Sequence, residues 1–497
     1  MKQSDVEIWF NRIIIGFTFI GILSAIINFI YNRSLWVDEA MISLNIINSS
    51  FYDLLKPLEM NQVAPIGFLL IQKMMAMVFN NQDWSLRIFP LVAYLLSVLL
   101  IYKLSFRFFN NEKISLLSAA MFSLNLLVVY YSTEAKQYSS DIFICLLLIY
   151  CTVCLFPFQN KNAVIKLLLL GFVSIWISNI AVIVLFSAGL WMFFLNLKKQ
   201  SAQRGVLSLV LLSWLVSFLV YYILFIKNHP SRNDMLVYWG RLYSFMPSNF
   251  FSFEPYRFIY LKFYFIFSDI LHFKKYSIVF ILFYFLGLVV SFRKTKFSFL
   301  FIFPFILHFL LSSQHLYPFE TRLILYFIPL IIILLSAGIF YSFQFCSDRI
   351  KKIPILVILM PGILNIYSVF KKTPNQRQEI KQSLNFINQH IDSTQSIFVY
   401  ERCKAPFLFY KNQYPNINDM QSSVSFGMLD RNDEQKANQS LKNIKKNTWL
   451  LFSNVYEGYR WSDEQYMLDK LKQNGYKIIQ QKISVGSSCY EIIKNPL

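Results

Sequence analysis

Charged side chains are scarce in this chain. Only 15% of its 497 residues are Asp, Glu, Lys or Arg, whereas 56% are hydrophobic and 18% are aromatic. A soluble domain carries about a quarter charged residues, so this chain lacks the polar surface that a water-soluble globule needs. Apolar runs of the ~20 residues that cross a bilayer recur between residues 13 and 370. The sequence therefore predicts a multi-pass membrane protein.

Cysteines are few and internal repeats are absent. Six scattered cysteines do not make a disulfide framework. Cys151 and Cys154 have the spacing of metal ligands, but no second pair or histidine accompanies them, so we interpret them as packing residues. The lack of a repeat weakens the case for a transporter built from duplicated halves.

Positive charge is in excess, with 47 Lys and Arg against 27 Asp and Glu and a net charge of +20. The bases stand in short tracts between apolar runs, for example Lys198 and Lys199 followed by Arg204. This pattern is typical of cytoplasmic loops that face anionic lipid, not of a groove that binds a phosphodiester backbone. We expect a lipid bilayer around the chain and no nucleic-acid partner.

Apolar runs and charged breaks predict about eleven membrane spans. They lie near residues 12–31, 87–106, 115–131, 141–157, 163–178, 179–197, 205–226, 277–292, 297–313, 322–343 and 353–370. If the N-terminus is cytoplasmic, every short basic loop between spans is also cytoplasmic, as the positive-inside rule requires. The first span is too long for a signal-peptide core and reads as a retained signal-anchor in the plasma (inner) membrane.

Two long loops and the tail then face the outside. Residues 32–86 form the first loop, in which two helices lie in the membrane plane. One of them covers residues 66–80, a short apolar run with Gln72 and Lys73 at its centre. Residues 227–276 form the second loop.

The tail differs in composition from the rest. We expect a transmembrane domain over residues 1–370 and a small extracytoplasmic α/β domain over residues 371–497. Its predicted elements are helices at 376–390 and 462–474 and strands at 396–400, 448–452, 476–483 and 488–493. Gly475 fits a C-cap after the second helix. Whether Cys403 and Cys489 pair in an oxidising compartment stays open.

Three polar clusters stand at predicted span ends. The first is Trp36 to Ala40, where Asp38 and Glu39 follow an interfacial tryptophan. Two adjacent carboxylates at the lip of the bilayer are candidates for acid–base chemistry. The ordinary alternative is the acidic first turn of a helix over residues 38–48, where carboxylates favour the helix dipole.

The second cluster covers residues 130–141. If this segment is helical, Glu134, Tyr138 and Asp141 share one face and Lys136 lies on another. Such groups are costly in lipid, so they face either a polar cavity or water, and a solvated turn is the plain alternative.

The third cluster, residues 315–322, contains Tyr317 and Arg322. Arg322 begins a long apolar helix and needs an anionic partner or the interface. Simple snorkelling to lipid headgroups is the alternative. A weaker cluster, residues 238–241, has the aromatic character of an interfacial anchor.

The three main clusters face the same outer side in this topology. A lipid-phosphate substrate needs such a mixture, because cations steady a departing phosphate and a carboxylate removes the proton of an acceptor hydroxyl.

At these residues the chain resembles the GT-C glycosyltransferases, multispanning enzymes that use polyprenyl-phosphate sugars. They include protein O-mannosyltransferases and lipid A aminoarabinose transferases, and the likeness is closest to the bacterial RgtA/B/C/D-like branch. Its ordered elements are WVDEA at 36–40, APIGFLLIQ at 64–72 with RIFP at 87–90, YYSTEAKQYSSD at 130–141, LYPFETR at 316–322, and GSSCYEI at 486–492. The chain has Ala64-Pro65 where the best-known relatives have two prolines.

The resemblance implies the roles of these residues. Asp38 is the catalytic base with Glu39 beside it, and Lys136 and Arg322 hold the donor phosphate. We expect the remaining substrate contacts at Glu134, Tyr138 and Tyr317.

The expected reaction is inverting transfer of a sugar from a polyprenyl-phosphate-linked donor to a hydroxyl of a glycan, lipid or protein acceptor outside. Some GT-C enzymes need a divalent metal as cofactor and others do not, and no ligand set in this sequence decides it. A flippase or transporter, or an O-antigen polymerase or ligase, is the rival interpretation.

Overall fold

The structure is a computed structural model that describes residues 3–197, 201–344, 365–420, 423–428, 435, 441, 444–457 and 462–494. The chain forms two compact units. The helical unit contains Met1–Ile30, Phe51–Pro57 and Asn61–Thr373. The sheet unit contains Tyr31–Ser50, Leu58–Met60 and Pro374–Leu497. Residues 31–50 therefore group with the C-terminal part of the chain.

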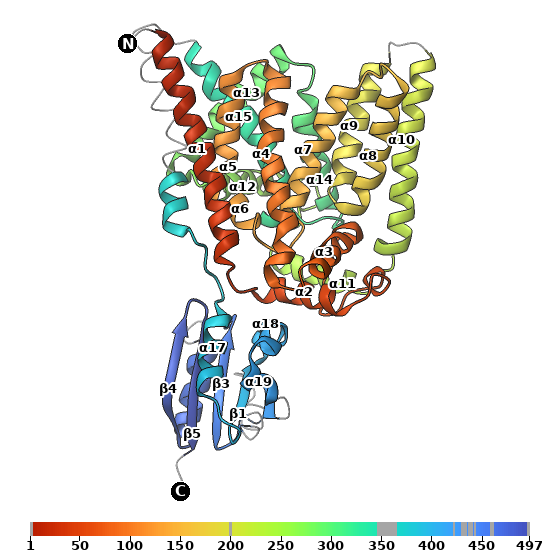
Figure 1. Ribbon diagram of the computed structural model, residues 1–497. Helices are drawn as coiled ribbons and strands as arrows, with labels where there is room; N and C mark the ends of the chain where they lie inside the picture. Colours follow the sequence, from red (N-terminus) through yellow and green to blue (C-terminus); the bar gives the residue numbers. More distant parts are fainter. Residues whose placement is uncertain are drawn as a thin grey trace. The chain divides into compact units, whose positions relative to one another are not determined.

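The helical unit is built from long apolar helices that stand side by side (Figure 1). They are α1 (Gln3–Tyr31), α4 (Ile88–Phe109), α7 (Tyr138–Leu155), α8 (Lys161–Ile177), α9 (Ala181–Asn196), α10 (Ser201–Tyr221), α13 (Ser277–Lys294), α14 (Phe299–Ser313) and α15 (Ile328–Gln344). Shorter helices are α3 (Ile66–Val78), α5 (Glu112–Ser123), α6 (Leu126–Tyr131), α11 (Arg232–Arg241) and α12 (Glu254–Phe265).

In the described part of the chain, six helices are long and apolar enough to cross a membrane. They are Asn11–Tyr31, Asp83–Phe109, Tyr138–Leu155, Gln203–Ile226, Lys274–Lys294 and Leu325–Ser342. Shorter apolar helices cover Ile66–Val78, Ala181–Asn196 and Phe299–Ser313. The chain is thus a multi-pass membrane protein, and the total of about eleven spans stays a prediction.

Two expected spans need comment. The span predicted at 115–131 is not one helix, because α5 ends at Ser123 and α6 begins at Leu126. Asn125 separates them, and its side-chain oxygen accepts hydrogen bonds from the amides of Leu127 and Val128. Asparagine is a strong N-cap, so it starts a new helix here. The span predicted at 353–370 lies mostly outside the described residues.

Helix α3 supports the in-plane interpretation of the first loop. Its 13 residues are fewer than the ~20 that a bilayer crossing requires. Gln72 is fully buried and donates a hydrogen bond to the carbonyl of Leu86 at 2.8 Å. Met74 and Met77 are exposed instead. The helix buries its polar groups and turns apolar ones outward, as suits a helix that contacts lipid.

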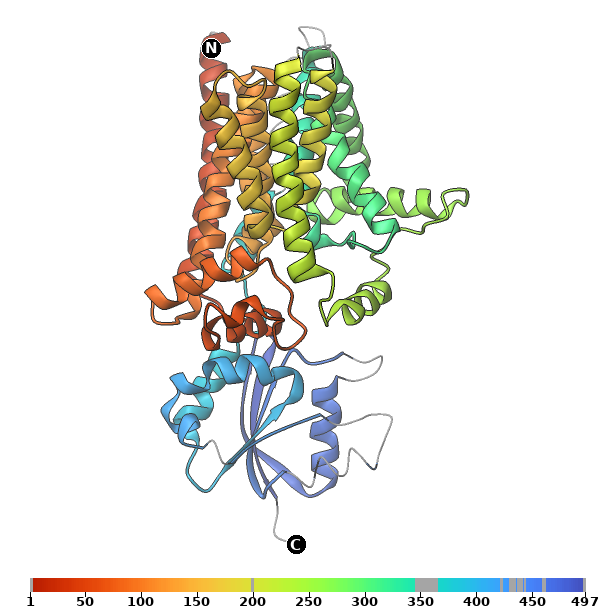
Figure 2. The same cartoon turned by 90° about the vertical axis from the view of Figure 1, so that its right-hand side faces the viewer.

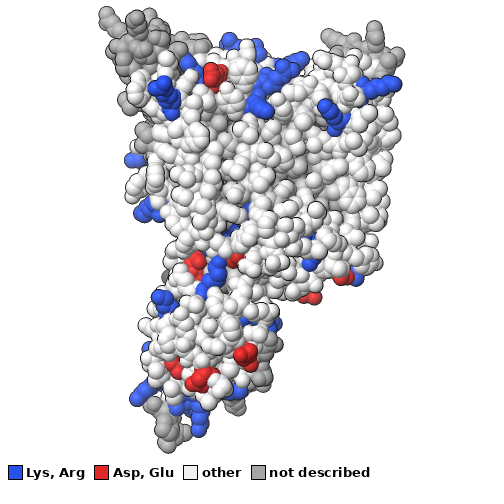
Figure 3. Space-filling view, in the orientation of Figure 1, with Lys and Arg blue, Asp and Glu red and all other residues white. Residues whose placement is uncertain are grey.

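Basic loops gather at one end of the helical unit. The connections α4–α5, α7–α8 and α13–α14 lie at the end that holds the N-terminus (Figure 1). The helix ends beside these connections carry Arg107, Lys113, Lys161, Arg293 and Lys294. Figure 3 shows Lys and Arg at this end and a nearly uncharged belt beside it. The distribution matches a positive-inside end next to a lipid-facing belt.

Helices α13 and α15 pack with their backbones close together. A Cβ atom added to Gly287 would collide with the carbonyl oxygen of Leu334, and one added to Gly338 would collide with that of Phe283. Small residues let helix backbones approach closely in membranes, where packing drives association. These two glycines therefore hold the α13–α15 pair together.

We expect Gly287→Ala to lower the thermal unfolding temperature of the full-length protein in detergent. Overpacking of this kind costs about 1–3 kcal/mol. Gly205→Ala in α10 is the matched control, because a Cβ atom there meets nothing within 4 Å. Equal unfolding temperatures for the two variants would contradict the close contact.

The sheet unit is a five-stranded mixed sheet with helices on both faces. Its strands are β1 (Ser396–Tyr400), β2 (Val424–Gly427), β3 (Asn447–Ser453), β4 (Tyr476–Ser484) and β5 (Ser487–Lys494), in the order β2-β1-β3-β5-β4. Strand β1 pairs in parallel with β2 and β3, and β5 pairs antiparallel with β3 and β4. Figure 2 shows α21 (Asp463–Gln473) on the opposite face from α18 (Lys404–Tyr410) and α19 (Pro415–Asp419).

The elements of this unit follow the sequence closely. All five residues of β1 are buried, which explains its continuous apolar run. Gly475 has φ +82°, so it caps α21 as predicted. The predicted helix at 376–390 begins later, at Ile380. Strand β2 has no sequence prediction, because it is short and only half-buried at the sheet edge.

The cysteines of the sheet unit are free thiols. Cys403 and Cys489 are both buried and are not joined. Cys489 donates to the carbonyl of Ser383 at 3.6 Å, and burial raises the pKa of its thiol to about 12. Both side chains therefore act as small packing groups here.

Candidate active site

The second sequence cluster is a buried turn between two helices. Helix α6 ends at Tyr131 and α7 begins at Tyr138. Glu134 therefore precedes α7. The sequence suggested that Glu134 shares a helix face with Tyr138 and Asp141, and this prediction is wrong. Residues 132–136 are all buried, so the alternative of a solvated turn is also wrong. Its backbone bends sharply, because the Lys136 amide donates to the Glu134 carbonyl at 2.7 Å.

Lys136 is buried at this turn. Its ammonium group donates a hydrogen bond to the side-chain oxygen of Gln62 at 2.7 Å, and its side chain is only 4% exposed. Gln62 comes from the segment just before α3 and was missed by sequence reasoning, because a lone glutamine in a loop carries no signal. A buried ammonium is costly and marks a functional position in a membrane protein.

Arg322 lies between two aromatic rings. Its guanidinium carbon is 5.8 Å from the ring centroid of Tyr138 and 5.2 Å from that of Trp239. It stands in a short 3-10 turn, Thr321–Leu323, and the long helix α15 begins only at Ile328. These two cation–π contacts replace the lipid snorkelling considered above. The ring of Tyr138 thus connects Arg322 with the turn that carries Lys136.

Glu320 forms a second ionic cluster beside Arg322. Its carboxylate accepts hydrogen bonds from Ser244 at 2.9 Å, from Lys262 at 3.2 Å and from the Thr321 amide at 3.1 Å. Burial alone would raise its pKa, but the hydrogen bond from Thr321 and the nearby Lys262 ammonium outweigh it and lower the pKa of Glu320. The cluster joins the second loop to residues 320–322, a long-range pairing with no sequence signature.

The Glu320–Lys262 pair predicts a pH dependence. The pKa of Glu320 is lowered in the folded state, so its ionised carboxylate stabilises the fold at pH values above its unfolded-state pKa of ~4.3. This stabilisation is lost as the pH falls through the folded-state pKa. The effect is about 1 kcal/mol or less for a partly exposed pair. As the pH is lowered from about 6 to about 3, the thermal unfolding temperature should decrease less steeply in Glu320→Gln than in wild type. Glu254→Gln, which alters an exposed pair with Arg257, should keep the wild-type slope.

Tyr317 is half-buried in the same region. Its ring stands edge-on to His308 with centroids 5.1 Å apart. His308 is held by the Tyr326 hydroxyl at 2.9 Å and the Pro318 carbonyl at 3.1 Å. Burial raises the pKa of Tyr317, and the nearby Asp141 charge adds to the rise. Tyr317 is thus a neutral phenol that shapes the region.

The first sequence cluster lies in the sheet unit. Helix α2 (Val37–Asn48) begins at the expected place, with Asp38 and Glu39 in its first turn. Asp38 is half-buried, whereas Glu39 is fully buried and its carboxylate lies 3.8 Å from the guanidinium of Arg33. Glu39 is therefore committed to an internal ion pair, and Asp38 is the carboxylate with access to solvent. Arg33 was missed because it reads as a juxtamembrane base.

Among the described residues, no three His, Cys, Asp or Glu side chains come together as a metal-ligand group. The basic side chains of this region are Lys136, Arg322 and Lys262.

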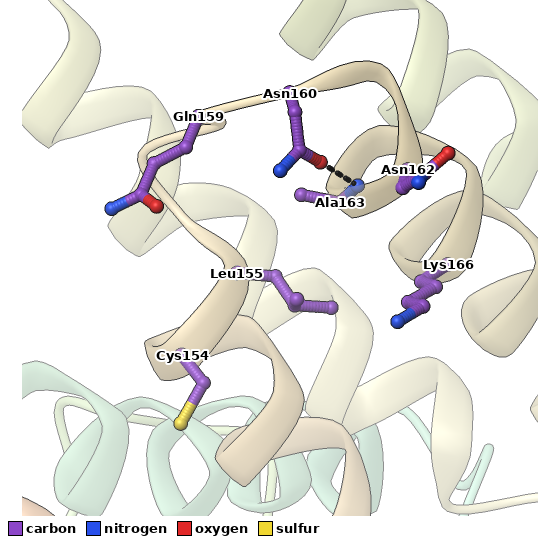
Figure 4. A pocket seen from close by; sticks show the side chains of 7 residues that line it. All are labelled: Cys154, Leu155, Gln159, Asn160, Asn162, Ala163 and Lys166. Carbon is purple, nitrogen blue, oxygen red and sulfur yellow. Dashed lines mark hydrogen bonds between the residues drawn. The ribbon is translucent and has the colours of Figure 1, made fainter.

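A small pocket lies elsewhere, at the basic end of the helical unit. It measures about 220 Å³ and is lined by Cys154, Leu155, Gln159, Asn160, Asn162, Ala163 and Lys166 (Figure 4). Asn160 accepts a hydrogen bond from the Ala163 amide at 2.9 Å and caps α8. Ligand pockets are usually ~300–1,000 Å³. This pocket is smaller, has no carboxylate in its lining and lies away from the clusters above.

Comparison with known proteins identifies the class. Residues 63–224 match the family described as dolichyl-phosphate-mannose-protein mannosyltransferase. The matched segment contains α3, the 132–137 turn and Lys136. The chain is a membrane glycosyltransferase, and over this segment it is similar to that family. It belongs with enzymes whose donors are polyprenyl-phosphate sugars.

Solved structures share the fold of this glycosyltransferase. ArnT from Cupriavidus metallidurans in the apo state has a TM-score of 0.53 and 10% identity, over 96% of this chain and 98% of that chain. ArnT bound to undecaprenyl phosphate has a TM-score of 0.50 and 9% identity, over 98% of both chains. The apo oligosaccharyltransferase of Archaeoglobus fulgidus has a TM-score of 0.54 and 11% identity, over 96% of this chain and 74% of that chain.

At these identities the likeness concerns the fold alone. It covers both the helical part and the C-terminal five-stranded domain of this glycosyltransferase. No curated protein sequence matches the chain.

Proposed function

We propose that this glycosyltransferase moves a sugar from an undecaprenyl-phosphate-type donor to a hydroxyl group of a glycan, lipid or protein on the extracytoplasmic face, with inversion. The observation that carries the proposal is the buried Lys136 together with the half-buried Arg322, which contacts the ring of Tyr138 two residues after Lys136. The likeness to a fold that binds undecaprenyl phosphate in ArnT supports the lipid carrier.

Lys136 and Arg322 are suited to a phosphate. Arg322 is fixed by two rings, so its fork of donors is oriented before the ligand arrives. Lys136 gives a point charge that is held by a neutral amide, Gln62, and a phosphate oxygen can replace that partner. Both groups stabilise negative charge as it builds on the leaving phosphate.

Asp38 is suited to act as the base. Glu39 is engaged with Arg33, whereas Asp38 is half-buried in the first turn of α2. A general base needs a carboxylate within hydrogen-bond reach of the acceptor hydroxyl. The proposal requires the Asp38 carboxylate to reach that hydroxyl.

The transfer is a single displacement. The acceptor oxygen forms a bond to the anomeric carbon as the bond from that carbon to the phosphate oxygen breaks. The acceptor proton moves to the Asp38 carboxylate, and the electron pair leaves with the polyprenyl phosphate. A phosphate leaves as an anion without prior protonation, so one carboxylate suffices, unlike hydrolysis by paired carboxylates.

The charge distribution supports the proposed orientation. The basic loops and the N-terminus share one end of the helical unit, which we assign to the cytoplasm. Helices α3 and α11 lie at the other end (Figure 1). The chain enters the sheet unit at Tyr31, after one crossing by α1, so this unit is assigned to the outside.

The proposal is tested with the full-length protein in liposomes. Tritium-labelled mannose or aminoarabinose would be supplied on undecaprenyl phosphate and, separately, on a nucleotide. Membranes of a strain lacking the gene would be added as the acceptor. We expect transfer of the labelled sugar from the lipid carrier and no transfer from the nucleotide. Transfer from the nucleotide sugar would overturn the proposal. Comparison of surface glycans with and without the gene would identify the acceptor.

A further inference from the structure

The segment that carries Asp38 is bound by side chains of the C-terminal residues of the sheet unit. We propose that Glu379, assisted by Gln378 and Tyr410, is a positioning residue that fixes the Asp38 turn of α2. The inference rests on the proposed role of Asp38 and extends it to the C-terminal domain, whose role is then to hold the base.

Glu379 binds the chain four residues before Asp38. Its carboxylate accepts hydrogen bonds from both the amide and the hydroxyl of Ser34, each at 3.2 Å. Ser34 is 1% exposed and Glu379 is 3% exposed. The Ser34 hydroxyl also accepts from the Lys381 amide at 3.1 Å. Hydrogen bonds to a buried carboxylate are among the stronger ones, so this contact fixes Ser34 firmly.

The next amides are bound in the same way. The amide of Leu35 donates to the Tyr410 hydroxyl at 2.9 Å, and the amide of Val37 donates to the side-chain oxygen of Gln378 at 3.0 Å. The Trp36 ring lies under the guanidinium of Arg377, with 3.5 Å from its carbon to the ring centroid. Every residue from 34 to 37 thus has a partner in the C-terminal part of the unit.

These contacts replace an ordinary helix cap. Trp36 is the N-cap of α2 and its side chain makes no capping hydrogen bond. The first amides of a helix have no partner inside the helix and need one from elsewhere. Gln378 supplies it for Val37, the residue directly before Asp38. The direction of the first turn, and with it the Asp38 carboxylate, is set by the C-terminal residues.

The binding residues are themselves anchored to one end of the sheet. The Glu379 amide donates to the carbonyl of Val485, next to the β4–β5 turn, at 2.8 Å. Gln378 also donates to Asn454, directly after β3, at 3.0 Å. The path from the sheet to the Asp38 turn therefore consists of hydrogen bonds made by the backbone of Glu379 and by the side chains of Gln378 and Glu379.

Three variants of the full-length protein test the proposal. Glu379→Ala leaves the buried Ser34 groups without their acceptor, whereas Glu379→Gln keeps a carbonyl oxygen there. Glu491→Ala is the matched control, because Glu491 is a similarly buried carboxylate of the same unit. It accepts two hydrogen bonds, from Gln395 at 2.6 Å and Gln480 at 2.8 Å.

We expect Glu379→Ala to lower kcat about 100-fold, because small misplacements of a reacting group have effects of this size. Binding of undecaprenyl phosphate should be unchanged, since the cations that would hold it are intact. Hydrogen exchange at the Ser34 amide should become faster. Glu379→Gln should recover most of kcat, and Glu491→Ala should keep the wild-type value. A wild-type kcat in Glu379→Ala, or an equal loss in Glu491→Ala, would overturn the proposal.

A double variant separates this proposal from the role of Asp38. If Glu379 acts only through Asp38, Glu379→Ala should cause no further loss in an Asp38→Asn background. Wild-type turnover in Asp38→Asn alone would refute the base assignment, while the exchange measurement still reports whether Glu379 fixes Ser34. If Glu379→Ala does not fold, Gln378→Ala and Tyr410→Phe each remove one contact, and each should lower kcat in the same direction. Wild-type kcat in both would overturn the proposal.

Discussion

Asp38→Asn should lower the rate of sugar transfer by about 10²–10⁴-fold, the usual contribution of a general base. The substitution keeps the size and hydrogen-bonding ability of the side chain but removes its capacity to accept the acceptor proton. Asp38 is half-buried in the first turn of α2, so the fold should tolerate the change. The measurement is transfer from labelled undecaprenyl-phosphate sugar by the protein in liposomes.

The control for Asp38 is Asp53→Asn. Asp53 lies in the same sequence region but forms an exposed ion pair with Lys56 at 2.7 Å. It should retain wild-type transfer, and both variants should bind undecaprenyl phosphate normally. Loss of lipid binding in Asp38→Asn would assign the carboxylate to donor binding instead of proton removal.

Glu39→Gln should chiefly reduce stability, because it breaks a buried ion pair with Arg33.

Arg322→Lys should lower kcat/KM by about 10²–10³-fold, the effect of removing one donor from a developing anion. The change keeps the charge, but an ammonium cannot stack between the rings of Tyr138 and Trp239 or bind a phosphate through two parallel hydrogen bonds. Weaker binding of undecaprenyl phosphate should accompany the loss. The measurement is the same transfer assay across donor concentrations.

Arg241→Lys serves as the matched control for Arg322. Arg241 is exposed and ends α11, the helix that carries Trp239. It should retain wild-type kcat/KM. A normal value in Arg322→Lys would mean that Arg322 is only a structural cation, and the phosphate site would then have to be sought elsewhere.

Much of the fold follows from local sequence signals. Apolar runs locate most of the helices of the helical unit. Four of the five strands of the sheet unit, all except β2, match their predictions to within about one residue, because each is a short apolar run between turn signals. Gly475 was recognisable as a cap since only glycine takes φ +82° without strain. Asn125 escaped recognition, because an apolar run hides a single capping residue.

The site was predictable only in part, because its partners are distant in sequence. The ionisable residues at span ends stood out, but Gln62 beside Lys136 and Lys262 beside Glu320 did not. The contact of Ser34 with Glu379 joins residues 345 positions apart. The grouping of residues 31–50 with the C-terminal unit depends on such contacts, and no composition or periodicity reports them.

One single-turnover measurement tests the central claim most directly. The full-length protein in liposomes would be mixed with one labelled undecaprenyl-phosphate sugar and acceptor membranes, and both products would be followed. We predict release of undecaprenyl phosphate in step with sugar transfer, and a product whose anomeric configuration is opposite to that of the donor. Retained configuration, or passage of the intact lipid-linked sugar across the bilayer without cleavage, would contradict the account.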